Sequence, residues 1–533
     1  MPHLSSTQPC GHAANLLSRR AELTPDRVAV IDETGAAASE VTFAELNARA
    51  NRAAHLLTHE LGVQPGDRVA VLAHNTLAYL DLLYAVGKIG AVLCPLNWRL
   101  TGAELTYIVG HAAPKVLFVG PECVELAAEV LEVAEVERVI AVDDAVLGDA
   151  PSYDAMVRCW FADEPPPPSE PLHADTPYAI LYTSGTTGRP KGAIIPHRQV
   201  LWNCMNVAAS WGLDEDDRTP IFLPMFHAGG LLALTTPLLY LGASITLHRG
   251  FDPDDTLRAI AQHRCTVILG VPTIFQMWLD CPSFEATDLS HVKFFITGGA
   301  PCPRPVMERF KRDKPGAVFR QGYGLTEVGP NCFSMTNAQA EQKVGSIGRP
   351  IFHSEVRVVD SDGAEVAPGE AGELLLSGPH VCAGYFNDSA ATQRAIVDGW
   401  FHTGDVVRRD DDGFFYVAGR KKEMIITGGE NVYAAEVEAV FDDHPAVIKS
   451  ALIGQPDAQW GELGVIVAEL RDEVSAEDLL RFGRTRLARY KLPRRVEFTR
   501  EMPYSAYGKV LKGELRQRYA TPTDNPPTRE AVR

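Results

Sequence analysis

Short apolar runs alternate with segments of helical spacing through the first part of the chain. GDRVAVLAHN at 66–75 has the composition of a strand, and TLAYLDLLYAVGKIG at 76–90 carries its apolar residues at helical intervals. Further short apolar runs stand at 91–96, 115–120 and 138–144. Alternation of this kind predicts parallel strands that are covered by helices.

The same alternation resumes with ASITLHRG at 243–250 and CTVILGVP at 265–272, and it changes near residue 344. From there, EVRVVDSDG at 355–363 and DGFFYVAGR at 412–420 are strand-like runs next to Asp-Gly turns. Such turns are typical of hairpins, so this region predicts an antiparallel β subdomain.

The region after Arg420 has a third character. It contains two apolar runs at 446–454 and 464–470 and a helical segment at 476–488. We expect a small α+β domain of about a hundred residues, which is an ordinary domain size. The last stretch, TPTDNPPTREAVR at 521–533, is polar and proline-rich, which predicts a disordered tail.

Composition limits the classes of function. The chain has 533 residues, 46% of them hydrophobic, so its length predicts roughly three or four folding units. Its formal net charge of −18 disfavours nucleic-acid binding, which needs a basic face, and disfavours a polybasic membrane contact.

Cysteines and apolar stretches indicate the compartment. The ten cysteines include no C-x-x-C pair and no zinc-like spacing, so reduced thiols are the simplest interpretation. The N-terminus lacks the pattern of a signal peptide, and the longest apolar stretch, 231–247, is broken by Thr, Pro and Gly. We expect a cytoplasmic protein without a membrane span.

One loop, YTSGTTGRPKG at 182–192, carries candidate chemistry. Glycines let backbone N–H groups approach a ligand, and the hydroxyls and Lys191 add donors and charge, so the loop suits a polyphosphate. It does not fit the P-loop pattern, because Pro190 stands where that motif needs its second glycine. An ordinary flexible surface loop remains the alternative at this point.

Four other stretches change that balance. They are FFITGGAP at 294–301, RQGYGLTE at 320–327, GWFHTGD at 399–405 and GRKKEMIITGGENVYAAEVE at 419–438. With the loop, and in this order, they resemble the adenylate-forming superfamily, which includes acyl-CoA synthetases, peptide-synthetase adenylation domains and beetle luciferases. The resemblance spans about residues 15 to 515 and is of the fatty-acid–CoA ligase type.

The resemblance implies a two-step reaction with ATP, Mg²⁺ and coenzyme A. A carboxylate attacks the α-phosphorus of ATP to give an acyl-adenylate, and a thiol then displaces AMP. Residues that match the family's ATP-binding positions are Thr183, Ser184, Gly185, Thr186, Thr187, Lys191, Gly299, Ala300, Tyr323, Asp405 and Arg420. Gly428 and Gly429 lie in the TGGENVY segment at 427–433, which the resemblance assigns to the pantetheine tunnel. Glu327 matches the magnesium carboxylate and Thr326 the residue beside the α-phosphate.

The resemblance also implies a moving C-terminal domain. Lys509 matches the lysine that bridges the two reacting anions, and His227 matches a histidine at the acyl and pantetheine channel. Residues 1–419 would form the adenylate-binding domain, 420–422 a hinge at Lys422, and 423–520 the mobile domain. The expected fold class is therefore α/β, with two α/β sheet subdomains and a β subdomain, followed by a small mobile α+β domain.

The sequence departs from the family at the lysine loop, which reads MPYSAYGK at 502–509. Tyr504 stands where a basic residue is usual, and Ser505 where a threonine is usual. This leaves open an enzyme that is weak in adenylation and mainly thioesterifies a supplied acyl-adenylate. Two further alternatives are an acyl-AMP ligase that loads a carrier protein and a non-catalytic ligand-binding homologue.

The acid itself is expected to be apolar. Small residues line the expected pocket, among them Gly229 and Gly230, which we expect to leave space for a ligand beside His227. Glu327 is its only charged residue, which favours a fatty or bulky ring acid over an amino acid. The predicted partners are this acid, ATP and CoA, with no nucleic acid, while a carrier protein and a homodimer stay open.

Overall fold

The computed structural model describes residues 13–183, 190–299, 302–427, 430–457, 460–505 and 509–519. The chain divides into two compact units. The large unit comprises residues 1–302, 306–357 and 375–403, and the small unit comprises 303–305, 358–374 and 404–533. The chain passes between them several times, the last time at Thr403 and Gly404, inside strand β19 (Trp400–Arg409).

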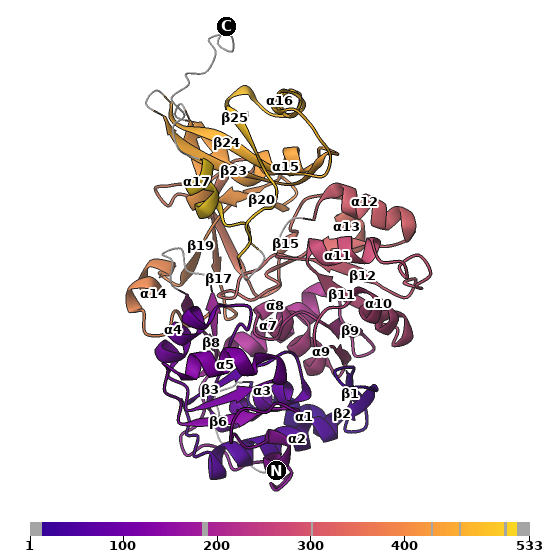
Figure 1. The fold of residues 1–533 in the computed structure, drawn as a ribbon, viewed down its shortest axis with the longest axis vertical. Coiled ribbons are helices and arrows are strands. Elements are labelled where there is room, and N and C mark those ends of the chain that lie inside the picture. Colours follow the sequence, from indigo (N-terminus) through magenta and orange to yellow (C-terminus); the bar gives the residue numbers. More distant parts are fainter. Residues whose placement is uncertain are drawn as a thin grey trace. The chain divides into compact units, whose positions relative to one another are not determined.

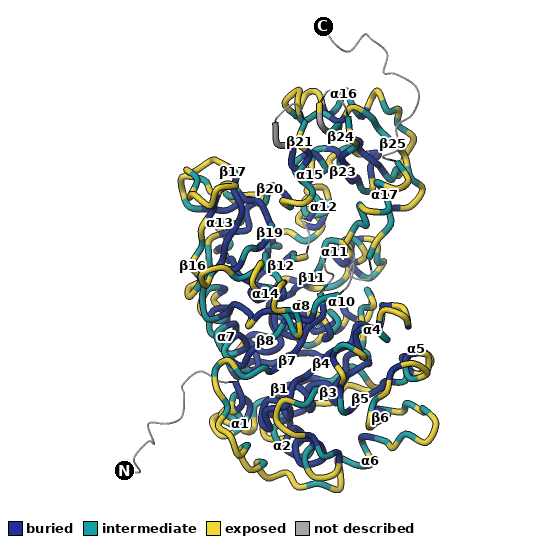
Figure 2. The backbone as a smooth tube through the Cα atoms, turned by 90° about the vertical axis from the view of Figure 1, so that its left-hand side faces the viewer, coloured by how far each residue is buried: buried dark blue, intermediate teal, exposed yellow. Residues whose placement is uncertain are grey.

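A six-stranded sheet in the large unit follows the predicted alternation. Its strands, in spatial order, are β6 (Arg138–Ala141), β5 (Val116–Val119), β3 (Arg68–Leu72), β4 (Val92–Pro95), β7 (Pro177–Thr183) and β8 (Lys191–Pro196). All pairs are parallel except β7 with β8. Strands β4 and β5 are buried along their whole length, as continuous apolar runs predict for a covered parallel sheet (Figure 2).

Helices α2 (Phe43–His55) and α3 (Leu77–Ile89) lie beside this sheet (Figure 1). Helix α2 begins with a capping box, in which the Thr42 hydroxyl and the Glu45 carboxylate each accept a backbone N–H of the other residue. Helix α3 is buried on nearly all sides and ends at Gly90, which has a φ of 71°. Glycine adopts that left-handed conformation without strain, so it ends the helix.

Seven further strands of the large unit form two smaller sheets. One has the order β2 (Ser39–Thr42), β1 (Val28–Asp32), β10 (Ser244–Leu247) and β9 (Arg218–Ile221), and the other β11 (Val267–Gly270), β12 (Phe294–Thr297) and β13 (Phe319–Gln321). Val30 and Ile245 of the first sheet share one hydrophobic core with Val69 and Leu93 of the six-stranded sheet. This shared core explains why two α/β layers form a single unit.

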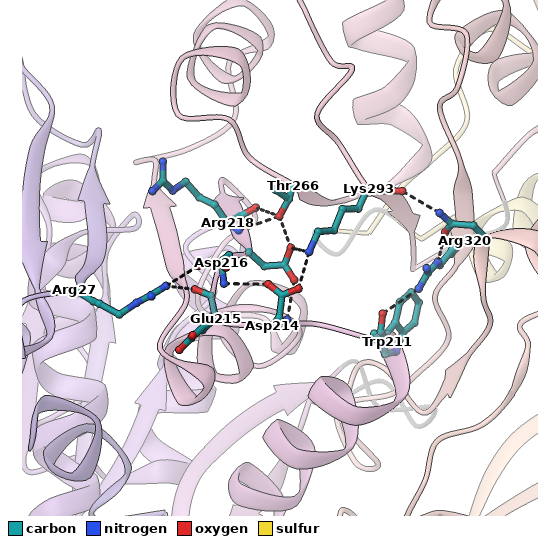
Figure 3. A network of polar contacts seen from close by, with 11 residues as sticks. Arg27, Trp211, Asp214, Glu215, Asp216, Arg218, Thr266, Lys293 and Arg320 are labelled. Carbon is teal, nitrogen blue, oxygen red and sulfur yellow. Dashed lines mark hydrogen bonds and ion pairs between the residues drawn. The ribbon is translucent and has the colours of Figure 1, made fainter. Parts of the chain in front are cut away.

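A polar network joins the N-terminal ends of these strands (Figure 3). The Lys293 ammonium lies 2.9 Å from Asp214 and 2.8 Å from Asp217, and the Thr266 hydroxyl donates to Asp217 at 2.6 Å. Burial alone would lower the pKa of Lys293, but its bonds to Asp217 and Asp214 raise it. The network residues immediately precede β9, β11 and β12, so the network stabilises the amino-terminal ends of these strands. Ligands of α/β sheets bind at the opposite, carboxyl ends.

The small unit is an α+β fold, as predicted. Its sheet has the order β22 (Glu430–Tyr433), β21 (Met424–Thr427), β24 (Gly461–Leu470) and β23 (Val447–Asp457), with β25 (Arg495–Thr499) parallel to β24. Helices α15 (Ala434–Asp442), α16 (Ala476–Arg484) and α17 (Lys512–Tyr519) accompany it. Val437, Phe441, Ile466 and Leu479 are buried in its core.

The remaining helices and strands complete the fold. The helices are α1 (Leu16–Leu23), α4 (Gly102–Ala112), α5 (Val124–Leu131), α6 (Tyr153–Val157), α7 (His197–Trp211), α8 (Ala228–Leu231), α9 (Thr235–Leu241), α10 (Pro253–Gln262), α11 (Pro272–Leu279), α12 (Arg304–Asp313), α13 (Asn337–Gln342) and α14 (Ser389–Ala395). The strands are β14 (Phe333–Ser334), β15 (Arg349–Pro350), β16 (Glu355–Val359), β17 (Ala371–Ser377), β18 (Ile396–Val397) and β20 (Phe415–Arg420). Of these, β16, β17, β18 and β20 form a five-stranded sheet with β19. Among the described residues, no helix combines the length and the apolar character needed to cross a bilayer.

Candidate active site

The base of the hydroxyl-rich loop is a strand pair in the large unit. Thr183 ends β7, Lys191 begins β8, and the two residues are paired across the sheet. The Thr183 hydroxyl donates to the Lys191 carbonyl at 3.5 Å. The predicted phosphate-binding residues Ser184, Gly185, Thr186 and Thr187 lie outside the described residues. The fold therefore places both ends of the loop, with the Lys191 side chain starting at its base.

The segment that carries Thr326 and Glu327 is held through three successive backbone carbonyls. Gln199 of α7 donates to the Thr326 carbonyl at 3.0 Å, and the Cys382 N–H donates to the Glu327 carbonyl at 2.7 Å. His380 Nδ1 lies 2.8 Å from the Val328 carbonyl. Because a carbonyl only accepts, the proton of His380 sits on Nδ1, and burial keeps the pKa of this histidine low. The backbone is thus fixed on one side.

The Glu327 carboxylate accepts a hydrogen bond from the Tyr385 hydroxyl at 2.9 Å. Burial, together with the charge of Glu327, raises the pKa of Tyr385 well above its usual value, so the hydroxyl stays a donor. Among the described residues, no group of three or more His, Cys, Asp or Glu side chains could hold a metal by itself. Mg²⁺ in nucleotide sites is held by one or two carboxylates with substrate phosphates, so Glu327 fits that requirement.

Gly299 and Tyr323 follow neighbouring strand ends. Strands β12 and β13 are parallel, and the Gly322 N–H donates to the Thr297 carbonyl at 2.7 Å just past the pair. Gly299 has a φ of 78°, a conformation that side chains rarely adopt. The Tyr323 ring packs edge to face on Phe333 at 5.5 Å. The predicted adenine residues therefore meet at one sheet edge, while Ala300 lies outside the described residues.

His227 caps the short helix α8. Its Nδ1 accepts the Gly229 N–H at 3.0 Å, so in the neutral ring the proton sits on Nε2, which can donate to a ligand. The imidazole is exposed. We expected the two neighbouring glycines, Gly229 and Gly230, to leave space for a ligand, but the structure gives Gly230 another role. A Cβ on Gly230 would stand 2.3 Å from the Pro224 carbonyl oxygen, so backbone packing requires that glycine.

Gly324 has the same property as Gly230. A Cβ there would lie 2.3 Å from the Gly329 carbonyl oxygen, in the tight turn that precedes Glu327. The small size of these two residues therefore reflects the fold and carries no information about the acid. At Gly229, in contrast, the first atom that a Cβ meets is the His227 ring, at 3.1 Å. This position remains a candidate pocket residue.

In the small unit, Asp405 and Arg420 face each other across the pair of β19 and β20. The Arg420 Nε lies 2.5 Å from an Asp405 oxygen, and the carboxylate is almost fully buried. Next along the chain, Lys421 forms an ion pair with Glu373 at 2.9 Å. Lys422 follows in a short 3₁₀ turn, and its side chain is exposed. The predicted ribose carboxylate and the predicted arginine thus orient one another.

Lys509 lies on a narrow hairpin of the small unit. The Leu511 N–H donates to the Pro503 carbonyl at 2.9 Å, and the Ser505 N–H donates to the Lys509 carbonyl at 2.7 Å. The Ser505 hydroxyl accepts the Lys509 N–H at 3.2 Å. Ser505, which stands where a threonine is usual, therefore holds the Lys509 backbone through its hydroxyl. Lys509 itself is exposed.

The hairpin is anchored where it joins α17. The Lys512 ammonium lies 2.8 Å from Glu423 and 2.7 Å from Glu438 of α15. Glu423 directly follows Lys422, so the predicted hinge segment and the Lys509 hairpin belong to one connected piece. Gly428 and Gly429, which were expected to line the thiol path, lie outside the described residues.

The large unit thus brings Thr183 and Lys191 at the loop base into one network with Thr326 and Glu327, through Tyr385. The small unit pairs Asp405 with Arg420 and carries Lys509 on a separate hairpin. Sequence reasoning missed Tyr385, Gln199 and His380. The partners of Tyr385 become visible only through the pairing of its segment with β8, because nothing in AGYFND predicts that register.

Family comparisons agree with this geometry. The family described as AMP-binding enzyme matches residues 17–386, and its C-terminal domain family matches residues 436–509. A feruloyl-CoA synthase from an Amycolatopsis species is 42% identical over 503 residues, covering 94% of this chain and 98% of that protein. An indoleacetate–CoA ligase from Aromatoleum aromaticum is 37% identical over 514 residues, covering 95% and 98%.

Solved structures extend the comparison to the fold and the cofactors. The o-succinylbenzoate CoA synthetase of Bacillus subtilis, in complex with its acyl-adenylate, has a TM-score of 0.82 at 31% identity, and the match covers 95% of this chain and 98% of that one. The same enzyme has been solved with ATP and a magnesium ion. The predicted fold class and the use of ATP, Mg²⁺ and CoA are confirmed, and the alternatives to CoA ligation are not favoured. The chain belongs to the AMP-binding enzyme family, as an adenylate-forming acyl-CoA synthetase that joins an apolar carboxylic acid to CoA.

Proposed function

We propose that the acid is a ring-bearing carboxylic acid of the arylalkanoic or arylpropenoic kind. The observation that carries this proposal is the 42% identity, over nearly the whole of both chains, to synthases named for a ring-bearing acid. The second relative is also named for a ring acid, joined to a short side chain. The small residue Gly229 beside His227 is consistent with a bulky acyl group next to the imidazole.

In the first step, an oxygen of the acid attacks the α-phosphorus of ATP, and pyrophosphate leaves. Two anions must approach each other, and Lys509 supplies a cation for the charge that they share in the transition state. Lys191 and the loop hydroxyls bind the phosphates, and Thr326 binds near the α-phosphate. When bound at Glu327, magnesium would neutralise phosphate charge.

In the second step, the CoA thiolate attacks the carbonyl carbon of the acyl-adenylate, and AMP leaves with its phosphate oxygen. Rotation of the residues after the hinge at Lys422 would withdraw Lys509 and present the segment at 427–433 to the pantetheine arm. Asp405 and Arg420 would hold the ribose throughout. His227 would donate its Nε2 proton toward the acyl or thiol group.

A panel of acids tests the choice of substrate. We expect CoA-dependent AMP release to be at least tenfold faster, in kcat/KM, with ferulate, cinnamate or indoleacetate than with octanoate or palmitate. A hydrophobic pocket discriminates between shapes by roughly 10–200-fold, so this difference is measurable. A preference for palmitate would overturn the ring-acid proposal and leave CoA ligation intact.

Three finer points belong to the same proposal. We expect CoA rather than a carrier-protein arm as the acceptor, which labelled acid offered to CoA and to a holo-carrier protein distinguishes. The nine cysteines of the described residues are all unpaired, which supports a reducing, cytoplasmic setting. A homodimer is tested by light scattering on the purified chain.

A further inference from the structure

Residues 383–386 extend the six-stranded sheet beyond β8. The Ile194 N–H donates to the Gly384 carbonyl at 2.9 Å, the Ala383 N–H donates to Ile194 at 3.0 Å, and the Phe386 N–H donates to Gly192 at 2.8 Å. Tyr385 is bridged to Ala193 in this antiparallel pairing. Because β8 begins at Lys191, the pairing brings Tyr385 to the base of the phosphate loop.

The backbone of this segment is fixed from α14. The Tyr385 N–H donates to the Thr392 hydroxyl at 2.9 Å, and that hydroxyl donates to the Asp388 carbonyl at 2.9 Å. Gly384 has a φ of 112°, and a Cβ there would lie 2.4 Å from a Thr392 methyl carbon. Only glycine fits, so the sequence specifies where the tyrosine stands.

The Tyr385 side chain contacts two residues of the proposed ATP site. Its hydroxyl donates to Glu327 Oε1 at 2.9 Å, and the Lys191 ammonium lies 5.2 Å from its ring centroid. The hydrogen bond from Tyr385 restricts rotation of the Glu327 carboxylate and occupies one lone pair of Oε1. The second is a cation–π contact, which favours the lysine over the ring face.

We propose that Tyr385 is a positioning residue, which orients the Glu327 carboxylate for magnesium and couples it to Lys191 of the phosphate loop. This inference rests on the role proposed for Glu327. A purely structural tyrosine would also fill this place, but its loss would affect both steps of the reaction alike. A positioning tyrosine acts only where magnesium and the phosphates are handled.

The test compares two deletions of a single hydroxyl in the full chain. Tyr385→Phe removes the bond to Glu327 and keeps the ring beneath Lys191. The matched control is Tyr178→Phe in β7, which removes a buried hydroxyl that donates to the Leu83 carbonyl at 2.8 Å, in the same sheet. The single variant Glu327→Gln and the double variant, which combines Glu327→Gln with Tyr385→Phe, complete a double-mutant cycle.

The first readout is calorimetric binding of ATP with and without Mg²⁺, in the absence of any acid. We expect Tyr385→Phe to reduce the magnesium-dependent gain in ATP affinity roughly tenfold and to leave metal-free ATP binding unchanged, since partners of a metal ligand affect metal affinity by such factors. The control should match the wild type. An unchanged magnesium gain in Tyr385→Phe overturns the proposal.

The second readout separates the half-reactions. Formation of acyl-adenylate at limiting Mg²⁺ should fall roughly tenfold in Tyr385→Phe, while consumption of a preformed adenylate by CoA stays within about twofold. Equal loss in both overturns the proposal, as do strictly additive losses in the double variant. If Glu327→Gln itself keeps the magnesium gain, the role of Glu327 is wrong, and the inference fails for that separate reason.

Discussion

At the scale of single residues, the glycines near His227 are small for different physical reasons. Gly230 has backbone against it, so no other residue fits there. Gly229 meets the edge of the His227 ring, a side chain that can shift by a few tenths of an ångström. Therefore only the small size of Gly229 carries information about the shape of the substrate.

We expect Gly229→Ala to change selectivity more than stability. The new methyl group stands 3.1 Å from His227 Nδ1, so the imidazole must shift by a few tenths of an ångström. The kcat/KM for ring acids should fall roughly tenfold, and that for acetate about twofold or less, because a methylene in a pocket is worth about 10–200-fold. The control is Gly110→Ala in α4, where no atom lies within 4 Å of the added Cβ. Equal losses on both acids would remove Gly229 from the pocket.

His248, which follows β10, predicts an acid-sensitive stability. Burial lowers its pKa to about 4, against the opposing charge of Glu33. The unfolded chain therefore binds a proton below about pH 6.5, while the folded one does not until about pH 4. Stability is complete above pH 6.5 and falls below it, by roughly 2 kcal/mol at pH 5.

His248→Gln should remove this sensitivity. Between pH 7 and pH 5, the Tm of the wild type should drop by a few degrees more than the Tm of the variant. Scanning calorimetry at both pH values measures the difference. Parallel drops would show that His248 is not buried in its neutral form.

Among the elements, the Lys509 hairpin has an unusual sequence, and its two described arms are joined by backbone and side-chain hydrogen bonds. The Ser505 hydroxyl accepts the Lys509 N–H, so a serine makes this contact where a threonine is usual. Tyr504 lies at the base of the hairpin, half exposed, and pairs through its backbone with Val510.

We expect Ser505→Ala to weaken adenylation selectively. Loss of one hydrogen bond of about 1 kcal/mol corresponds to roughly fivefold in rate, if it loosens only the placement of Lys509. Pyrophosphate exchange with the cognate acid should fall by that factor, and thioesterification of a preformed adenylate should not change. Ser505→Thr should restore exchange. A fall in both half-reactions would assign the serine to folding instead.

The elements themselves were predicted well, because buried parallel strands appear as continuous apolar runs, as in VLFV at 116–119. The strands that end at Thr183, Thr297 and Gln321 are each followed within two residues by a glycine, so the sequence also predicts where these strands end. The link from Glu327 to Tyr385 could not be predicted, since the residues are far apart in sequence and meet only through the added pairing on β8. Likewise, the close approach of the Pro224 carbonyl oxygen to Gly230 depends on the path of the backbone between them, which the sequence does not specify.

At the scale of the whole molecule, the account needs one polypeptide to perform two half-reactions. Two compact units exist, and strand β19 runs from one to the other. The hinge at 420–422 stays a prediction. Lys512 ties the piece that follows it to the Lys509 hairpin, so a rotation there would carry the lysine along.

We expect Lys422→Pro to separate the half-reactions. Proline fixes φ near −65° and removes a backbone donor, so it should hold the chain in one orientation. One half-reaction should keep its rate, and the other should fall at least tenfold; rapid-quench assays of each step measure this. Lys421→Ala, which breaks only the ion pair with Glu373, is the matched control. If both steps keep their rates in Lys422→Pro, the hinge lies elsewhere.

The most direct measurement of the central claim follows the acyl-adenylate itself. The purified chain is given ferulate, ATP and Mg²⁺ without CoA, the mixed anhydride is quantified by mass spectrometry, and CoA is then added. The account predicts that stoichiometric feruloyl-adenylate accumulates and disappears on addition of CoA, with AMP released. Lys509→Ala should form it at least a hundredfold more slowly, yet consume a supplied adenylate normally. Formation of feruloyl-CoA with no adenylate at any time, or equal loss of both steps in Lys509→Ala, would contradict the account.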